Sequence, residues 1–239
     1  MKALKNKEIY PFIILLIILL PFVLIPKHDS FLFVNSLHFP FGDRLFKHIT
    51  WLGEGFLLCC CIILLLFERV QWFFVFLIAV CIHVVLIQVN KQYLFQEAMR
   101  PLSYFKHLCQ ESIIYHVPGI KVHHAVSFPS GHTTGATFAL SFIALVIRNQ
   151  KISWCLALIG IMVGFSRVYL SQHFVVDVYF GYVFGTFSSL IGLLLVQSFS
   201  SRYHWMNTYL IKTFTIRHLR IYFEVFRHSF YRSVRSSLK

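Results

Sequence analysis

Charged residues are scarce in this chain. Only 13% of its 239 residues are Asp, Glu, Lys or Arg, and 57% are apolar, whereas about a quarter of an average soluble domain is charged. A water-soluble globule of this length cannot hide so much apolar surface, because a chain of this size still exposes a large part of its area. The same composition excludes intrinsic disorder. The sequence therefore predicts an integral membrane protein.

Acidic residues are rarer still. Nine Asp and Glu stand against 22 Lys and Arg, which gives a net charge of +13. The segment 201–239 alone holds eight basic residues and one acid, Glu224. Basic residues beside apolar segments are the topogenic pattern of membrane proteins. We therefore expect membrane lipids, and not nucleic acid, to be the partner of the positive charge.

The sequence also lacks a cysteine framework. No Cys-x-x-Cys pair and no His/Cys spacing of a zinc site occurs, and no cluster of Asp and Glu is present that could hold magnesium. Five of the six cysteines lie inside apolar runs, where free cysteine behaves as a small hydrophobe: Cys59, Cys60, Cys61, Cys81 and Cys155. We expect neither a metal nor another cofactor.

Six apolar segments have the length of about 20 residues, within a range of roughly 17 to 25, that a membrane-spanning helix needs. They cover residues 9–25, 49–67, 70–89, 125–147, 152–170 and 174–197. We therefore predict an all-α polytopic membrane protein, with a six-transmembrane-helix bundle over residues 1–200 and a basic tail over 201–239. The first segment lacks a small-residue cleavage site, so we interpret it as a retained anchor.

The distribution of Lys and Arg predicts the orientation in the membrane. Placing the N-terminus in the cytoplasm puts fourteen of these residues inside and eight outside. We therefore expect a protein of the inner (plasma) membrane with both termini cytoplasmic. In the tail, apolar residues recur at spacings of three and four beside arginines, which predicts a basic amphipathic helix on the inner leaflet: Ile216, Leu219, Phe223, Phe226, Phe230 and Val234. Protein partners stay open.

Ionisable residues are costly at membrane depth, so those near the ends of spans need a reason to be there. They fall into three clusters, all on the predicted outer side. The clusters are Lys91 with Arg100-Pro101, then Pro129-Ser130-Gly131-His132, and finally Ser166-Arg167 with His173 and Asp177.

His173 and Asp177 are four residues apart, so on a helix they share a face. A carboxylate bonded to one imidazole nitrogen fixes the tautomer and leaves the other nitrogen basic, as in an activated nucleophile or general base. Arg167 offers a planar fork that suits phosphate oxygens. The alternative is a histidine and an aspartate that neutralise each other in a packed bundle.

The second cluster has the composition of a helix N-terminus. Free backbone N–H groups at such a terminus form an anion site. Ser130 can add a hydroxyl donor, and His132 can supply a proton to a leaving group. A plain N-cap followed by a core histidine is the alternative. Because the three clusters together are strongly positive, a multiply charged anion, best a phosphate, is the expected ligand.

These clusters resemble the signatures of the type 2 phosphatidic acid phosphatase superfamily. Residues 166–177 match its SRxxxxxHxxxD signature, residues 129–132 match PSGH, and Arg100-Pro101 resembles the end of KxxxxxxRP. The family lysine stands seven residues before the arginine, where this chain has Tyr93, and Lys91 stands nine before it. Two residues are about 200° of helix rotation, so we expect this segment to bulge or unwind if Lys91 serves the site.

The resemblance implies a metal-independent mechanism in two steps. His173 would attack phosphorus and form a phosphohistidine, and Asp177 would orient it. His132 would protonate the leaving oxygen and then activate water. The residues implied to hold the phosphate oxygens as charge redistributes are Arg100, Arg167, Lys91, Ser130 and the Gly131 N–H.

We therefore expect a membrane phosphatase, with its site at the outer membrane–water boundary, that acts on a lipid-linked phosphate. The substrates considered are undecaprenyl pyrophosphate, a lipid A phosphate, phosphatidylglycerol phosphate and phosphatidic acid, and a short chain rich in Phe and Ile favours the first three. A phosphotransferase with the same intermediate and a non-catalytic lipid-phosphate transporter are the alternatives. A metal-dependent hydrolase is a more distant one.

Overall fold

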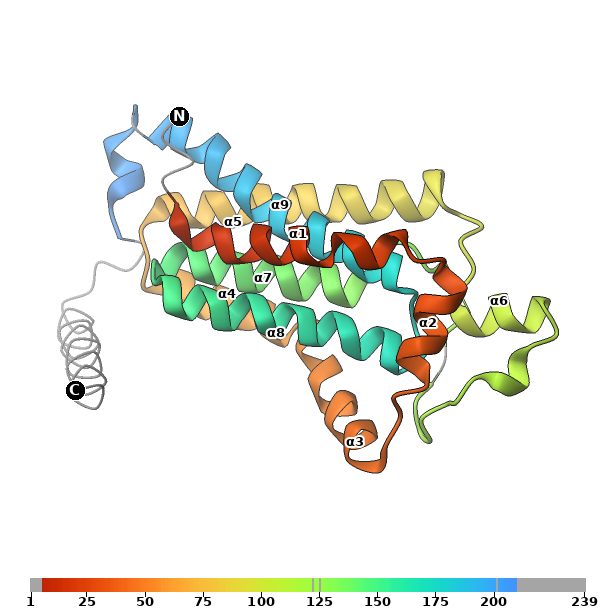
Figure 1. Ribbon diagram of the computed structural model, residues 1–239. Coiled ribbons are helices and arrows are strands. Elements are labelled where there is room, and N and C mark those ends of the chain that lie inside the picture. The colour runs from red at the N-terminus through yellow and green to blue at the C-terminus, as the bar shows by residue number, and fades with distance from the viewer. Residues whose placement is uncertain (1–5, 122, 125, 201, 210–239) are drawn as a thin grey trace, which may run out of the picture.

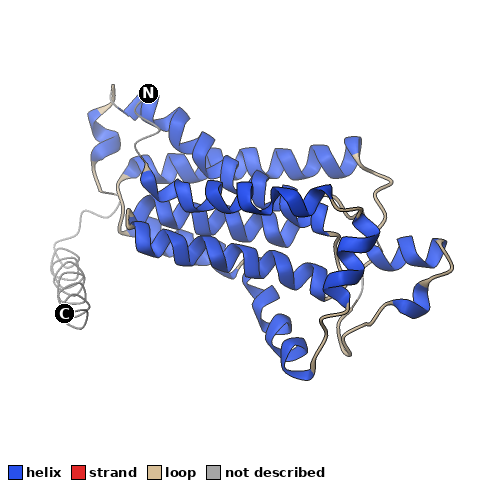
Figure 2. Ribbon diagram, in the orientation of Figure 1, coloured by secondary structure: helices blue, strands red, loops and turns tan. Residues whose placement is uncertain are grey.

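The computed structural model describes residues 6–121, 123–124, 126–200 and 202–209, and these residues form helices and loops without a strand (Figure 2). An isolated bridge joins Arg69 and Tyr209. The main helices are α1 (Tyr10–Leu24), α2 (Lys27–Asn35), α3 (Pro40–Ile49), α4 (Phe56–Leu66), α5 (Val70–Val89), α6 (Pro101–His107), α7 (Gly131–Ile147), α8 (Gln150–Tyr169) and α9 (Val175–Ser200). Shorter helical turns are η2 (Lys7–Ile9), η3 (Thr50–Gly53), the π-helical η4 (Asn90–Leu94), η5 (Glu111–Ile113) and η6 (His204–Asn207).

The all-α polytopic membrane fold is confirmed, but six spanning helices are not. Four helical segments of the described chain are long and apolar enough to cross a bilayer: Lys7–Leu24, Val70–Leu94, Gln150–Tyr169 and Val175–Ser200. A fifth span is possible if the bent pair Pro40–Gly53 and Phe56–Leu66 counts as one. The segment predicted as a span over residues 125–147 contains only the 17-residue helix α7, because residues 126–130 are not helical and Ser130 caps the helix.

The segment predicted as one span over residues 49–67 is interrupted. Turn η3 ends at Gly53, and α4 begins only at Phe56, with a bend of 46° between the two parts. Gly55 has a φ of +100°, a left-handed conformation that glycine adopts without steric cost. This break places the backbone of η3 and the side chain of Glu54 at the end of the bundle.

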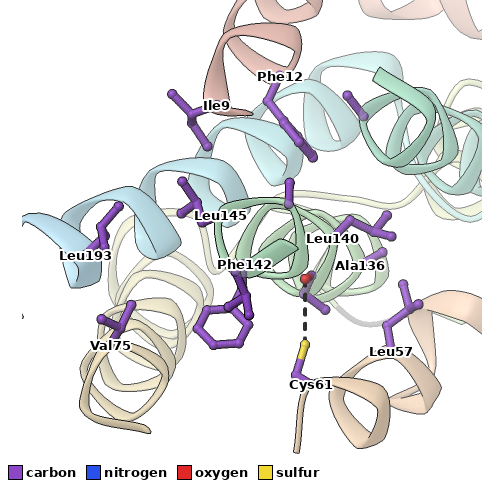
Figure 3. Packing of buried hydrophobic residues seen from close by; sticks show 14 of the residues in the cluster. Ile9, Phe12, Leu57, Cys61, Val75, Ala136, Leu140, Phe142, Leu145 and Leu193 are labelled. Carbon is purple, nitrogen blue, oxygen red and sulfur yellow. Dashed lines mark hydrogen bonds between the residues drawn. The ribbon is translucent and has the colours of Figure 1, made fainter. Parts of the chain in front are cut away.

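Helix α7 forms the centre of the bundle. It packs against α4, α5, α8 and α9, and Figure 3 shows its residues Phe142 and Leu145 surrounded by apolar side chains of the neighbouring helices. The Cys61 thiol of α4 donates a hydrogen bond to the Ala139 carbonyl of α7 (3.6 Å). A helix that is apolar nearly all round is one that other protein elements enclose, and this explains why α7 can be short.

Small residues let α9 lie very close to α7. A Cβ added at Gly185 would lie 2.5 Å from the Thr134 carbonyl oxygen and 2.7 Å from the Phe138 nitrogen. A Cβ added at Gly181 would lie 2.9 Å from the Ser130 carbonyl oxygen. The two helices are therefore in backbone contact, which holds the start of α7 and the start of α9 in one fixed relation.

The two ends of the bundle differ in what they carry. At one end of the bundle, α1 starts and α4, α7 and α9 terminate. At the other end, α5 and α8 terminate and α7 and α9 start, beside α2, α3 and α6 (Figure 1). The three predicted clusters belong to this second end. The tail residues 210–239, with their predicted amphipathic helix, lie outside the described residues.

Candidate active site

A buried histidine–aspartate pair stands where α8 passes into α9. His173 and Asp177 are 1% and 3% exposed, and His173 Nδ1 lies 3.4 Å from Asp177 Oδ2. The same carboxylate oxygen accepts the backbone N–H of Phe174 (3.0 Å), so it is fixed from two sides. With Nδ1 directed at the carboxylate, Nε2 is the nitrogen of His173 that stays available as a base or nucleophile.

Ser127 joins this pair, and the sequence did not indicate it. Its hydroxyl donates to Asp177 Oδ2 (2.5 Å) and lies 3.4 Å from His173 Nδ1. It is 1% exposed and stands two residues before the Pro129–His132 cluster. The residues it contacts, His173 and Asp177, are about 50 positions away in the chain, and no local sequence spacing predicts a contact over that separation.

The surroundings of His173 keep its imidazole neutral. Burial lowers the pKa of His173 from 6.5 to about 4, and the positive charges of Arg100 and Arg167 act in the same direction. The hydrogen bond to Asp177 and its negative charge oppose this change only in part. Near neutral pH the ring therefore carries a lone pair, as a nucleophile requires.

Two buried arginines lie beside the pair. Arg100 is 8% exposed, and its Nη1 donates to the Gln172 carbonyl (3.1 Å); burial lowers the pKa of this guanidinium. Arg167 is 5% exposed, and its Nη1 donates to the Thr50 hydroxyl (2.6 Å). The Arg167 Nε–H is buried and has no hydrogen-bond partner among the described residues. A buried donor without a partner is costly, and phosphate oxygens would satisfy it.

The N-terminus of α7 supplies the third element of the site. The Ser130 N–H donates to the Asp177 carbonyl oxygen (3.0 Å), and the Ser130 hydroxyl accepts from the Thr133 N–H (3.5 Å). A Cβ added at Gly131 would meet no atom within 4 Å. There is therefore open space in front of this helix terminus, where its N–H groups and dipole favour an anion.

Lys91 lies in a distorted segment, as expected from its spacing. Residues Asn90–Leu94 form a π-helical turn at the end of α5, and such a turn changes the direction in which the following side chains point. The Lys91 ammonium donates to the Val126 carbonyl (3.3 Å), in the segment that leads to Ser127. The electrostatic neighbours of Lys91 include Arg100 and Asp177, so the lysine stands at the same site.

The side chain of His132 faces η3 and the adjoining residue Glu54. His132 Nε2 lies 3.7 Å from Glu54 Oε1, and the His132 side chain is 29% exposed. The backbone of Gly53 lies so close that an added Cβ would be 2.7 Å from His132 Cβ. Thr50 and Glu54 were predicted only as parts of a membrane span, so the sequence did not place them at the site.

The structure thus brings the eight predicted site residues to one end of the bundle, within or next to a single network. That network adds Ser127, Thr50 and Glu54. Among the described residues, no group of three or more His, Cys, Asp or Glu side chains is arranged to hold a metal ion. The arrangement offers one buried histidine with an available nitrogen, one more accessible histidine and several donors for anionic oxygens.

Comparison with known proteins points to one family. The model of the PAP2 superfamily matches residues 70–201. Two relatives come from Bacillus subtilis (strain 168): undecaprenyl-diphosphatase BcrC is 45% identical over 73 residues, and phosphatidylglycerophosphatase B is 34% identical over 85 residues. These matches cover 27% and 32% of this chain, and 37% and 40% of the relatives. The matched regions thus amount to about two fifths of the relatives' length.

Two solved structures are similar. The crystal structure of Aquifex aeolicus LpxE has a TM-score of 0.57 at 26% identity, covering 70% of this chain and 93% of that one. The crystal structure of the first transmembrane PAP2 type phosphatidylglycerolphosphate phosphatase from Bacillus subtilis has a TM-score of 0.50 at 23% identity, covering 81% and 97%. The second likeness concerns the fold alone.

Proposed function

This chain belongs to the PAP2 superfamily, and from this premise we propose that it is an integral membrane phosphatase that hydrolyses a lipid-linked phosphate monoester or pyrophosphate. The observation that carries the proposal is the buried His173–Asp177 pair beside Arg100 and Arg167. A neutral imidazole next to concentrated positive charge suits attack on an anionic phosphorus centre.

In the first step, His173 Nε2 attacks phosphorus, a P–N bond forms, and the bond from phosphorus to the lipid oxygen breaks. His132 gives its proton to that leaving oxygen. Asp177 stabilises the positive charge that develops on the His173 ring. The phosphate oxygens bind to the guanidinium groups, to Lys91 and to the donors of the α7 terminus at Ser130 and Gly131.

In the second step, water replaces His173 on phosphorus. His132, now neutral, takes a proton from the water as the oxygen attacks. The P–N bond breaks, inorganic phosphate leaves, and His173 returns to its neutral form. The protonated His132 is then ready for the next turnover, and neither step requires a metal ion. Metal independence is accordingly part of the proposal.

The position of the site supports a lipid substrate. A site at one end of a membrane-spanning bundle can take a headgroup while the chain of the substrate stays in the bilayer. We include undecaprenyl pyrophosphate and phosphatidylglycerol phosphate, which fit the names of the two relatives, and a lipid A phosphate. Arg69 and Arg148 flank helices, and Lys151 lies in the first turn of α8, all at the opposite end. This distribution supports cytoplasmic termini and a site that faces the periplasm or outside.

The test measures inorganic phosphate released by the full-length protein in detergent, with EDTA present, from each of these lipids. The wild type should release phosphate from at least one lipid, and the His173→Ala variant should release none from any. Loss of activity in EDTA, with recovery on adding a divalent metal, would contradict metal independence.

Absence of release by the folded wild type on every lipid would overturn the phosphatase proposal. In that case a lipid or sugar alcohol is added as acceptor. A phosphorylated acceptor would identify a phosphotransferase with the same nucleophile.

A further inference from the structure

Each histidine of the site has its own carboxylate, and that of His132 comes from Glu54. We propose that Glu54 is a positioning residue that favours the protonated form of His132, the form that donates a proton to the leaving oxygen. This inference rests on the proposed function. Glu54 lies before residue 70, outside the region that the family model matches.

The break in the second predicted span is what brings Glu54 to the site. The backbone of Gly53 packs on the Cβ of His132, where an added side chain would not fit. Gly55 then takes its left-handed conformation (φ +100°), and α4 begins in a new direction. A continuous helix through residues 49–67 would have no such change of direction. With this change, Glu54 Oε1 lies 3.7 Å from His132 Nε2.

The other charges around His132 oppose its protonation. Burial of His132 opposes its protonation most strongly, and Arg167, His173, Arg100 and His123, from α8 and from the loops beside α6, α7 and α9, act in the same direction. Asp177 is already engaged with His173 and with the Ser127 hydroxyl. Of the acidic side chains that the structure describes, Glu54 is the one within ion-pair distance of His132. A nearby carboxylate favours the charged form of a histidine, so Glu54 offsets the surrounding cations.

The geometry also gives the two ring nitrogens of His132 different partners. An imidazolium has two N–H groups. With Nε2 directed at Glu54, Nδ1 is the nitrogen that can donate to the leaving oxygen. Glu54 is 56% exposed at its side chain, so solvent weakens the attraction, and the expected effect is a moderate one.

The test uses leaving groups that differ in their need for a proton. Octyl phosphate releases an alkoxide that must be protonated, whereas 4-nitrophenyl phosphate releases a stable phenolate. Glu54→Gln should lower kcat on octyl phosphate roughly tenfold, a part of the roughly 10²–10⁴-fold that a general acid contributes. On 4-nitrophenyl phosphate its kcat should stay within about twofold of the wild type, and the alkaline limb of the octyl phosphate profile should move to lower pH.

Three further variants make the test decisive. Glu111→Gln removes another exposed negative charge and should stay within about twofold of the wild type on both substrates. The Glu54→Gln, His132→Ala double variant should match His132→Ala alone, because Glu54 acts through His132. Glu54→Asp keeps a charge at a greater distance and should fall between the wild type and Glu54→Gln on octyl phosphate. It also serves as the test variant if Glu54→Gln does not fold.

Equal losses on the two substrates, or an unchanged kcat on octyl phosphate, would overturn this role of Glu54. An inactive wild type on all phosphates would instead overturn the proposed function, so the two failures are distinguishable.

Discussion

At the residue scale, the two histidines of the site have different surroundings that suit different tasks. His173 is almost fully buried, and its partner Asp177 is bonded from several sides. His132 has a side chain that is 29% exposed and a partner at the rim of the site. Near-complete burial of His173 favours the neutral ring that the proposed nucleophile needs, whereas the carboxylate of Glu54 favours the protonated form that the proposed role of His132 needs.

Ser127 provides a test of how the nucleophile is held. The Ser127→Ala variant loses the hydroxyl that bonds to Asp177, so the carboxylate and the ring of His173 can shift. We expect a kcat roughly 10- to 100-fold lower, with KM little changed, because small misplacements of a reacting group are costly. The measurement is steady-state phosphate release, and Ser127→Cys, which keeps a weak donor, should retain more activity.

A matched control for Ser127 is Ser188→Ala. Ser188 is also buried, but its hydroxyl bonds to the Phe184 carbonyl within α9. If Ser127→Ala kept the kcat of the wild type, Ser127 would have no part in positioning the pair.

The pH dependence of the reaction follows from the pKa of His173. In the proposed mechanism the neutral ring is the nucleophile, so activity should be present above that pKa and should be lost as the pH falls through it. Because burial lowers the pKa to about 4, the acid limb of kcat/KM should lie near pH 4 and not near the 6.5 of an ordinary histidine. The measurement is a pH profile of kcat/KM, corrected for the ionisation of the phosphate substrate, which a separate titration gives. An acid limb near 6.5 would contradict the prediction.

At the element scale, two local distortions serve the site. The π-helical turn Asn90–Leu94 brings Lys91 to the segment before Ser127. The break after Gly53 brings Glu54 to His132. The shift of Lys91 from the family spacing predicted the first distortion. The second was not predicted, because residues 49–67 are apolar enough to be interpreted as one continuous helix.

The contact between α7 and α9 is the packing that the site depends on most. Gly185→Ala would place a methyl group against the α7 backbone at Thr134 and Phe138. We expect the free energy of unfolding to fall by about 1–3 kcal/mol, as overpacking usually costs. The measurement is the thermal unfolding midpoint of the purified protein, which should decrease.

Gly135→Ala is the matched control within the same helix pair. An added Cβ at Gly135 would meet no atom within 4 Å. Removal of a glycine from a helix interior stabilises by about 0.5–1 kcal/mol, so the midpoint should stay or rise. Equal losses in the two variants would show that the close approach at Gly185 is not what stabilises the helix pair.

At the scale of the whole molecule, the basic tail and the site belong to different regions of the chain. The site residues lie between Thr50 and Asp177, and the predicted amphipathic helix begins after residue 212. Deletion of residues 213–239 should weaken contact with the membrane surface but leave phosphate release within about twofold of the wild type. The measurement is release by the inserted, folded truncation, and a complete loss of turnover there would contradict the prediction.

The sequence by itself determined the class of the protein and most of its long helices, and it predicted eight site residues that the structure brings to one end of the bundle. These depend on composition and on spacing within single segments, which are local properties of the chain. Only the tertiary structure decided that the short helix α7 is central, that the second apolar segment is broken, and that Ser127, Thr50 and Glu54 stand at the site. Those features depend on contacts between residues far apart in the chain, and packing of the whole bundle sets them.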